Sequence, residues 1–139
     1  MIDTDVSLNV LLREMPFAET SAKVFFLLER GYARGYATAT TITNVFYIAR
    51  KRQGREAALA CVRSLLNTKG LDILGVDKAI LADALESGMT DYEDAVQASA
   101  AKFEELDLIV TRNLRDFKES GIETVTPETF LDMMMKVMK

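Results

Sequence analysis

Two aspartates three residues apart are the first feature of this sequence that could do chemistry. Asp91 and Asp94 lie in residues 90–103, where small and apolar residues predict a helix. At this spacing both carboxylates fall on one face of its first turns. Thr90 and Glu93 have the S/T-x-x-E spacing of a capping box, which predicts the helix start. The helix dipole also favours first-turn acids, so Asp91 and Glu93 have a purely structural interpretation too.

A second polar group follows the next apolar run. Leucine, isoleucine and valine dominate residues 106–110, which predicts a buried parallel strand. This strand would end at Thr111 and open into a polar loop that includes Asn113 and Asp116. Ligands of open α/β sheets bind beyond the carboxyl ends of the strands, so we expect Thr111 and Asp116 at the functional edge. Asp116 could otherwise be an ordinary turn or cap residue.

A third carboxylate comes from the beginning of the sequence. The apolar residues before Asp3 predict a strand stub, whose carboxyl end would lie at the same edge as Thr111. Asp3, Asp94 and Asp116 would repel each other without a cation, so such a cluster can concentrate Mg²⁺ or Mn²⁺. Asp3 and Asp5 also match the D-x-D start of haloacid-dehalogenase-type phosphatases, although the chain is short for that fold. Otherwise Asp5 is typical of a turn.

The composition removes several classes of active site. No histidine occurs in the 139 residues, which excludes Ser-His-Asp and Cys-His catalysis and most zinc sites. The single cysteine, Cys61, allows no internal disulfide and fits a reducing cytoplasm, where we expect the protein. No stretch approaches the ~20 apolar residues of a membrane span, so no membrane partner is expected. The net charge of −4 lowers the expectation of generic nucleic-acid binding, unless metal neutralises several acids.

Short apolar strands and amphipathic helices alternate along the sequence. We predict strands at 35–39, 71–76, 106–110 and 122–125, and helices at 19–30, 40–52, 55–67, 77–85 and from 126 onward. This pattern predicts one domain, residues 1–139, in the α/β class: a three-layer α/β/α sandwich around a mainly parallel sheet. Asn44 would lie near the start of the helix at 40–52, close to the functional edge.

Two surface features suggest partners. Arg112 and Arg115 lie in the loop at the functional edge and could hold substrate phosphates. Residues 131–138 are apolar on too many sides for a fully solvated helix. Core packing explains part of that surface, and a homodimer contact or a protein partner would cover the rest, because methionines adapt to variable partners.

The order of these motifs resembles the PIN-domain family. The resemblance is carried by Ile2-Asp3-Thr4, by DYEDAVQASAAK at 91–102, by IVTRNLRDF at 109–117 and by the closing TPETFL at 126–131. It spans essentially the whole chain. It implies an α/β/α sandwich that cleaves RNA with Mg²⁺ or Mn²⁺ held by clustered acids. For the bacterial VapC-type members it also implies a toxin that is paired with an antitoxin.

The resemblance assigns roles to individual residues. By position, Asp3, Asp94 and Asp116 match the metal-binding acids of the family, and Thr111 matches a hydroxyl residue beside the site. Asp91 matches an outer ligand, and Asn44, Asp91 and Thr111 would orient waters or the substrate phosphate.

The sequence departs from the family pattern at two amides. Asn44 stands where many members have glutamate, and Asn113 stands where some have aspartate. The loss of charge would weaken a second metal ion first. Two hypotheses follow: a metal-dependent endoribonuclease that is the toxin of a toxin–antitoxin pair, or a catalytically weak PIN-like module that binds RNA or protein.

Overall fold

The computed structural model describes residues 1–138, in which short strands alternate with single helices or helix pairs. The helices are α1 (Thr4–Leu11), α2 (Phe17–Glu29), α3 (Ala39–Gln53), α4 (Arg55–Leu66), α5 (Lys78–Leu85), α6 (Tyr92–Phe103), α7 (Pro127–Val137) and the 3-10 helix η1 (Leu114–Phe117). The strands are β1 (Gly35–Thr38), β2 (Leu71–Leu74), β3 (Ile109–Val110) and β4 (Thr124–Val125). The predicted alternation is therefore confirmed, although all four strands are shorter than predicted.

The first three residues join two parallel strand pairs. β1 pairs with β2, and β3 pairs with β4. The N–H of Ile2 donates to the carbonyl of Tyr36 at 2.8 Å, and the N–H of Asp3 donates to the carbonyl of Val110 at 3.0 Å. The N–H of Val110 donates in turn to the carbonyl of Met1 at 2.8 Å. The start of the chain therefore forms the predicted strand stub, between β1 and β3, and it ends at Asp3.

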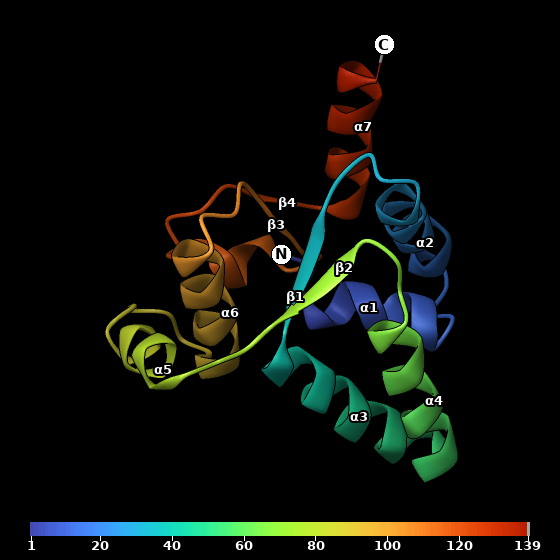
Figure 1. Cartoon of the computed structure of the whole chain (residues 1–139), viewed down its shortest axis with the longest axis horizontal. Helices are drawn as coiled ribbons and strands as arrows, with labels where there is room; N and C mark the ends of the chain where they lie inside the picture. The colour runs from blue at the N-terminus through green and yellow to red at the C-terminus, as the bar shows by residue number, and fades with distance from the viewer. Residues whose placement is uncertain (139) are drawn as a thin grey trace.

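Side chains on the two sides of this sheet enter two separate cores. Ile2 and Val110 belong to the core shared with α1, α2, α3, α4 and α7, whereas Met1 and Ile109 belong to the core shared with α5 and α6. Neighbouring strand residues point to opposite faces, so the sheet lies between two helical layers. Figure 1 shows α5 and α6 on one side of β1 and β2, and α1 and α4 on the other. The predicted three-layer sandwich with a parallel sheet is confirmed.

The start of α6 differs from the predicted capping box. The N-cap is Asp91, whose Oδ1 accepts a 2.9 Å hydrogen bond from the N–H of Asp94. Thr90 lies one residue before the cap, so the prediction that Thr90 caps the helix is wrong. Aspartate is a stronger N-cap than threonine, which explains the choice between these neighbours. The shift leaves the Glu93 side chain free for contacts outside its own helix.

The C-terminal helix α7 is covered on one side only. Phe130 is buried, and Leu131, Met133 and Met134 pack against the core. Met135 and Val137 remain 59% and 78% exposed. Core packing thus covers part of the apolar surface of α7, as predicted, and leaves the rest facing outward. Within residues 1–138, no helix has both the length and the apolar character needed to cross a membrane.

Candidate metal centre

The candidate site is built around Asp3, the last residue of the central strand and the N-cap of α1. Its side chain accepts a 2.7 Å hydrogen bond from the N–H of Thr4, the first residue of α1. Oδ1 also accepts from Gln97 Nε2 at 2.8 Å, and Oδ2 accepts from Thr111 Oγ1 at 2.7 Å. Asp3 is buried, so these donors compensate for lost hydration and fix its orientation.

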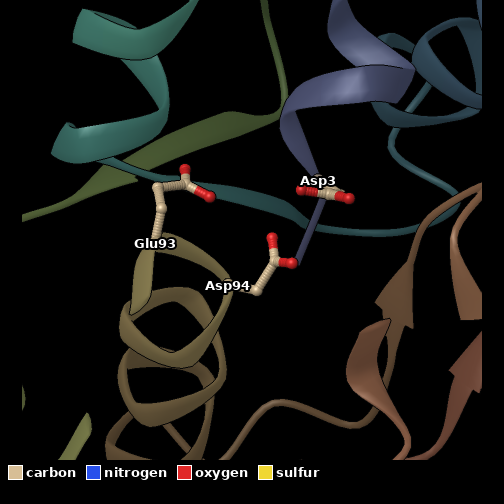
Figure 2. Close-up of side chains that lie close together, drawn as sticks. All are labelled: Asp3, Glu93 and Asp94. Carbon is tan, nitrogen blue, oxygen red and sulfur yellow. The ribbon is translucent and has the colours of Figure 1, made fainter. Parts of the chain in front are cut away.

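Two carboxylates on the first turn of α6 meet Asp3. Asp3, Glu93 and Asp94 each offer one carboxylate oxygen, and these three oxygens lie within 4.8 Å of one another. Figure 2 shows the side chains of Glu93 and Asp94 at the N-terminal end of α6, directed toward Asp3 at the start of α1. The pKa of Asp94 is raised to about 8, chiefly by burial and in addition by the negative charges of Asp3, Asp91, Glu93 and Asp116. A divalent cation would relieve this repulsion.

The donor set fits a hard divalent cation. Carboxylate oxygens are the ligands that Mg²⁺ and Mn²⁺ prefer. With Mg–O distances of about 2.1 Å, two ligands on opposite sides of one ion are about 4.2 Å apart. The three carboxylate oxygens lie within 4.8 Å of one another, so a small side-chain shift or one bridging water would bring them to this spacing. In addition, Gln97 Oε1 and Asp5 Oδ1 are buried without a hydrogen-bond partner among residues 1–138, which points to a water or an ion nearby.

Asp5 is part of the site, although the sequence favoured a turn role for it. Its Oδ2 accepts from the N–H of Arg112 at 3.1 Å and from Asn113 Nδ2 at 3.0 Å. The pKa of Asp5 is raised to about 7, chiefly by burial and in addition by the charge of Asp3. Asp5 therefore ties the loop after β3 to the start of α1, close to Asp3.

Thr111 and Asn113 contact the acids through hydrogen bonds. Thr111 is fully buried, and its hydroxyl donates to Asp3 and accepts from the N–H of Asn113 at 3.0 Å. The Asn113 amide donates to Asp5, which a carboxylate at this position could not do. The departure from the family pattern at Asn113 thus has a local reason, since an aspartate there would face Asp5 with the same charge.

Three other predicted residues lie farther from the cluster. Asp116 is exposed in η1 and is not one of the three acids that lie within 4.8 Å, although its charge contributes to the raised pKa of Asp94. Asn44 is half-buried on α3, and within residues 1–138 no hydrogen bond joins it to the cluster. Asp91 is exposed and caps α6. The structure therefore brings Asp3 and Asp94 together and leaves Asp116 and Asn44 in outer positions.

Arg112 is enclosed by protein acceptors. Nε donates to Asn9 Oδ1 at 2.6 Å, Nη1 donates to both carboxylate oxygens of Glu128 at 3.0 Å, and Nη2 donates to Phe17 O and Ser21 Oγ at 3.2 and 2.9 Å. All three nitrogens of the guanidinium therefore have protein acceptors. The guanidinium also lies over the Phe17 ring at 4.3 Å. The Arg112 side chain is only 13% exposed, and it joins the loop after β3 to α1, α2 and α7. Arg115 remains exposed.

Sequence reasoning missed two contacts of the site. Glu93 was interpreted as a first-turn acid and Gln97 was not singled out, yet Gln97 Nε2 donates to Glu93 Oε2 at 2.8 Å and also contacts Asp3. A signal was present, because Gln97 is a polar residue one turn after Glu93, within a stretch of α6 that is otherwise made of small and apolar residues from Ala95 to Ala101.

Comparisons with known proteins agree with this fold. A family model described as a PIN domain matches residues 1–115. Similar solved structures include VapBC2 from Rickettsia felis bound to a DNA fragment from their promoter (TM-score 0.72, 16% identity, 91% of this chain and 96% of that chain). Mycobacterium tuberculosis VapC20, a sarcin-ricin loop cleaving toxin, aligns with TM-score 0.70 and 14% identity over 87% of this chain and 94% of that chain. A toxin–antitoxin complex from Klebsiella pneumoniae aligns with TM-score 0.62 and 20% identity over 91% of this chain and 95% of that chain. Comparison with curated proteins gives no significant match.

Proposed function

Because the chain belongs to the PIN-domain family, we propose that it is a metal-dependent endoribonuclease. The convergence of Asp3 and Asp94 carries this proposal. These carboxylates come from segments far apart in the sequence. Asp3 ends the strand stub at the start of the chain and Asp94 lies in α6, yet both lie at one edge of the sheet. Such a cluster of acids is unfavourable in the free protein and becomes favourable around a divalent cation.

The proposed roles follow from the contacts of each residue. Asp3 and Asp94 would hold Mg²⁺ or Mn²⁺, with Asp116 completing the set from η1. A bound divalent cation would supply charge stabilisation at the scissile phosphate. Thr111 keeps Asp3 in place through its hydroxyl. Exposed Arg115, beside Asp116, is the arginine of this loop that we assign to the RNA phosphate.

RNA cleavage by the purified chain tests this proposal. Cleavage should require Mg²⁺ or Mn²⁺, should stop in EDTA and should return when Mn²⁺ is added back. The Asp94→Asn variant should cleave RNA at least about a hundredfold more slowly. Removing a residue that only supports a metal ligand typically lowers activity 10–100-fold, and removing a ligand itself should cost more. Equal cleavage by wild type and Asp94→Asn, or cleavage unchanged in EDTA, would contradict the assignment.

We further propose that the protein is a toxin that an antitoxin holds inactive. Support comes from the similar structures of toxin–antitoxin complexes and from the apolar side of α7 that Met135 and Val137 leave exposed. A neighbouring reading frame for a small DNA-binding protein is the expected antitoxin gene. Its product should form a complex with the chain and suppress RNA cleavage. A homodimer would cover the same surface, and light scattering of the purified chain distinguishes the two.

A second function has one observation in its favour. Asn44 and Asn113 are amides at positions where family members often carry acids. A catalytically weak module that binds RNA or protein would be consistent with that reduced charge. RNA binding without cleavage at saturating Mn²⁺ would support this alternative over the nuclease.

A further inference from the structure

Glu93, the third acid of the cluster, lies near the start of α3, the helix that carries Asn44 in place of an acid. The Thr4 hydroxyl is 3.3 Å from Glu93 Oε1 and 3.4 Å from Thr41 Oγ1. Thr41 belongs to the first turn of α3, and Asn44 follows it on the same helix. Glu93 therefore brings its carboxylate from α6 toward the start of α3, where the family pattern has an acid and this chain has an amide.

Gln97 holds Glu93 beside Asp3. Its side chain is fully buried one turn after Glu93. Nε2 donates to Glu93 Oε2 at 2.8 Å and to Asp3 Oδ1 at 2.8 Å, so both N–H groups of one amide lie between two carboxylates. The opposite end of the amide, Oε1, is buried without a partner among the described residues. Such an oxygen beside an acidic cluster points to an additional ligand at the site.

We propose that Glu93 is a carboxylate ligand of the metal centre, supplying the negative charge that Asn44 does not, and that Gln97 is its positioning residue. The inference rests on the proposed function, since it concerns the same divalent cation. It also bears on the choice between nuclease and weak module. If Glu93 restores the missing charge, then the amide at Asn44 does not by itself imply a weak metal site.

Titration of Mn²⁺ into the full chain, followed by calorimetry, tests the role of Glu93. The Glu93→Gln variant keeps the size of the side chain and one acceptor oxygen, for either Thr4 or Gln97, and it removes the charge. It should bind Mn²⁺ about tenfold more weakly, or worse, because cation affinity follows the charge of the ligands. In EDTA its Tm should rise, because repulsion with Asp3 and Asp94 is relieved. A glutamate that only supports the fold gives the opposite pair of results, a lower Tm and unchanged Mn²⁺ affinity.

A Gln97 variant tests the positioning role, and two control variants lie on the same helix. Gln97→Met should weaken Mn²⁺ binding about tenfold, the usual effect of removing an outer contact of a metal ligand. Ser99→Ala removes another buried hydroxyl contact of α6, to Asp83 and away from the cluster, so it should lower the Tm without weakening Mn²⁺ binding. Glu104→Gln removes an exposed charge at the other end of α6 and should leave Mn²⁺ affinity within about twofold.

The outcomes separate this inference from the proposed function. Wild type that binds Mn²⁺ and cuts RNA, with an equally tight Glu93→Gln variant, overturns the role of Glu93 alone. A Gln97→Met variant with a lower Tm and wild-type Mn²⁺ affinity overturns the positioning role. Wild type that neither binds Mn²⁺ nor cuts RNA overturns the proposed function and this inference together. The Glu93→Gln comparison stands even if Gln97→Met does not fold, because Glu93 is only half-buried.

Discussion

The hydroxyl of Thr111 donates a 2.7 Å hydrogen bond to Oδ2 of Asp3, and both side chains are buried. This bond joins the carboxyl end of β3 to the end of the central strand. It is the shortest link between the two segments that the resemblance to PIN domains singled out at this edge. Asp3 thus owes its orientation partly to a residue more than a hundred positions later in the sequence.

Replacing Thr111 with valine should weaken the metal centre. Thr111→Val keeps the shape and leaves Asp3 Oδ2 without its donor, which costs about 1–3 kcal/mol of unfolding free energy for a buried acceptor. Mn²⁺ affinity should fall by about tenfold. Calorimetric titration and urea unfolding measure the two effects. Thr124→Val, which removes only a local bond from Thr124 Oγ1 to Ile122 O, is the control and should leave Mn²⁺ binding unchanged.

The stability of the metal-free protein should fall as the pH rises toward 8. The pKa of Asp94 is about 8 in the folded chain, above the 3.8 of a free aspartate, so the folded state holds a proton that the unfolded state has lost between these values. Stability therefore decreases across this window and levels off above pH 8. Asp5, with a pKa of about 7, acts in the same direction. Thermal unfolding in EDTA from pH 5 to 8.5 measures the trend.

The raised pKa values of Asp94 and Asp5 also predict how metal binding and mutation change the pH dependence of stability. Mn²⁺ binding at pH 7 should release protons, because the ligands must be ionised, and calorimetry in two buffers of different ionisation enthalpy counts them. Asp94→Asn should flatten the pH dependence of the Tm in EDTA. A wild-type Tm that rises steadily from pH 5 to 8 in EDTA would contradict the raised pKa of Asp94.

Arg112 should matter for stability rather than for RNA binding. Arg112→Ala removes the donors that reach Asn9, Ser21 and Glu128, so we expect a loss of about 2–3 kcal/mol in unfolding free energy. Arg112→Lys should recover only part of it, because an ammonium cannot reproduce the planar fork. Urea unfolding gives both values. Arg34→Ala, at an exposed ion pair with Asp72, should cost less than about 0.5 kcal/mol.

Arg115 should show the reverse behaviour. Arg115→Ala should change stability by less than about 0.5 kcal/mol, since its side chain is exposed. RNA affinity should fall, and the slope of log K against log salt should shrink by about 0.7, the value for one phosphate contact on a single strand. Arg50→Ala, at the far end of α3, is the matched control. An unchanged salt slope for Arg115→Ala would remove this arginine from the RNA contact.

The fold was accessible from sequence because its signals are local. Apolar runs such as the one ending at Val110 mark the strands, and the spacing of apolar residues marks the helices between them. The order of these elements leaves few topologies once parallel strands are assumed. The same logic places Asp3 and Thr111 at one edge, because both follow strands. Residues at strand ends are therefore the part of the site that sequence alone predicts well.

The remaining contacts depend on side-chain geometry that no local pattern encodes. The N-cap is Asp91 and not the predicted Thr90, so the Glu93 side chain does not take part in a capping box and instead contacts Thr4 and Gln97. In the same way, the charge of Arg112 was visible in the sequence, whereas the acceptors that surround it come from three separate helices. Their convergence is a product of tertiary packing.

The attachment of Arg112 to Glu128 has a practical consequence for anyone who shortens this protein. The segment that matches the PIN-domain family model stops at residue 115, thirteen positions before the glutamate that receives the guanidinium. A fragment trimmed to that boundary would also lack β4 and the last helix. The smallest piece worth expressing therefore extends through α7, because residues beyond 115 anchor the loop after β3.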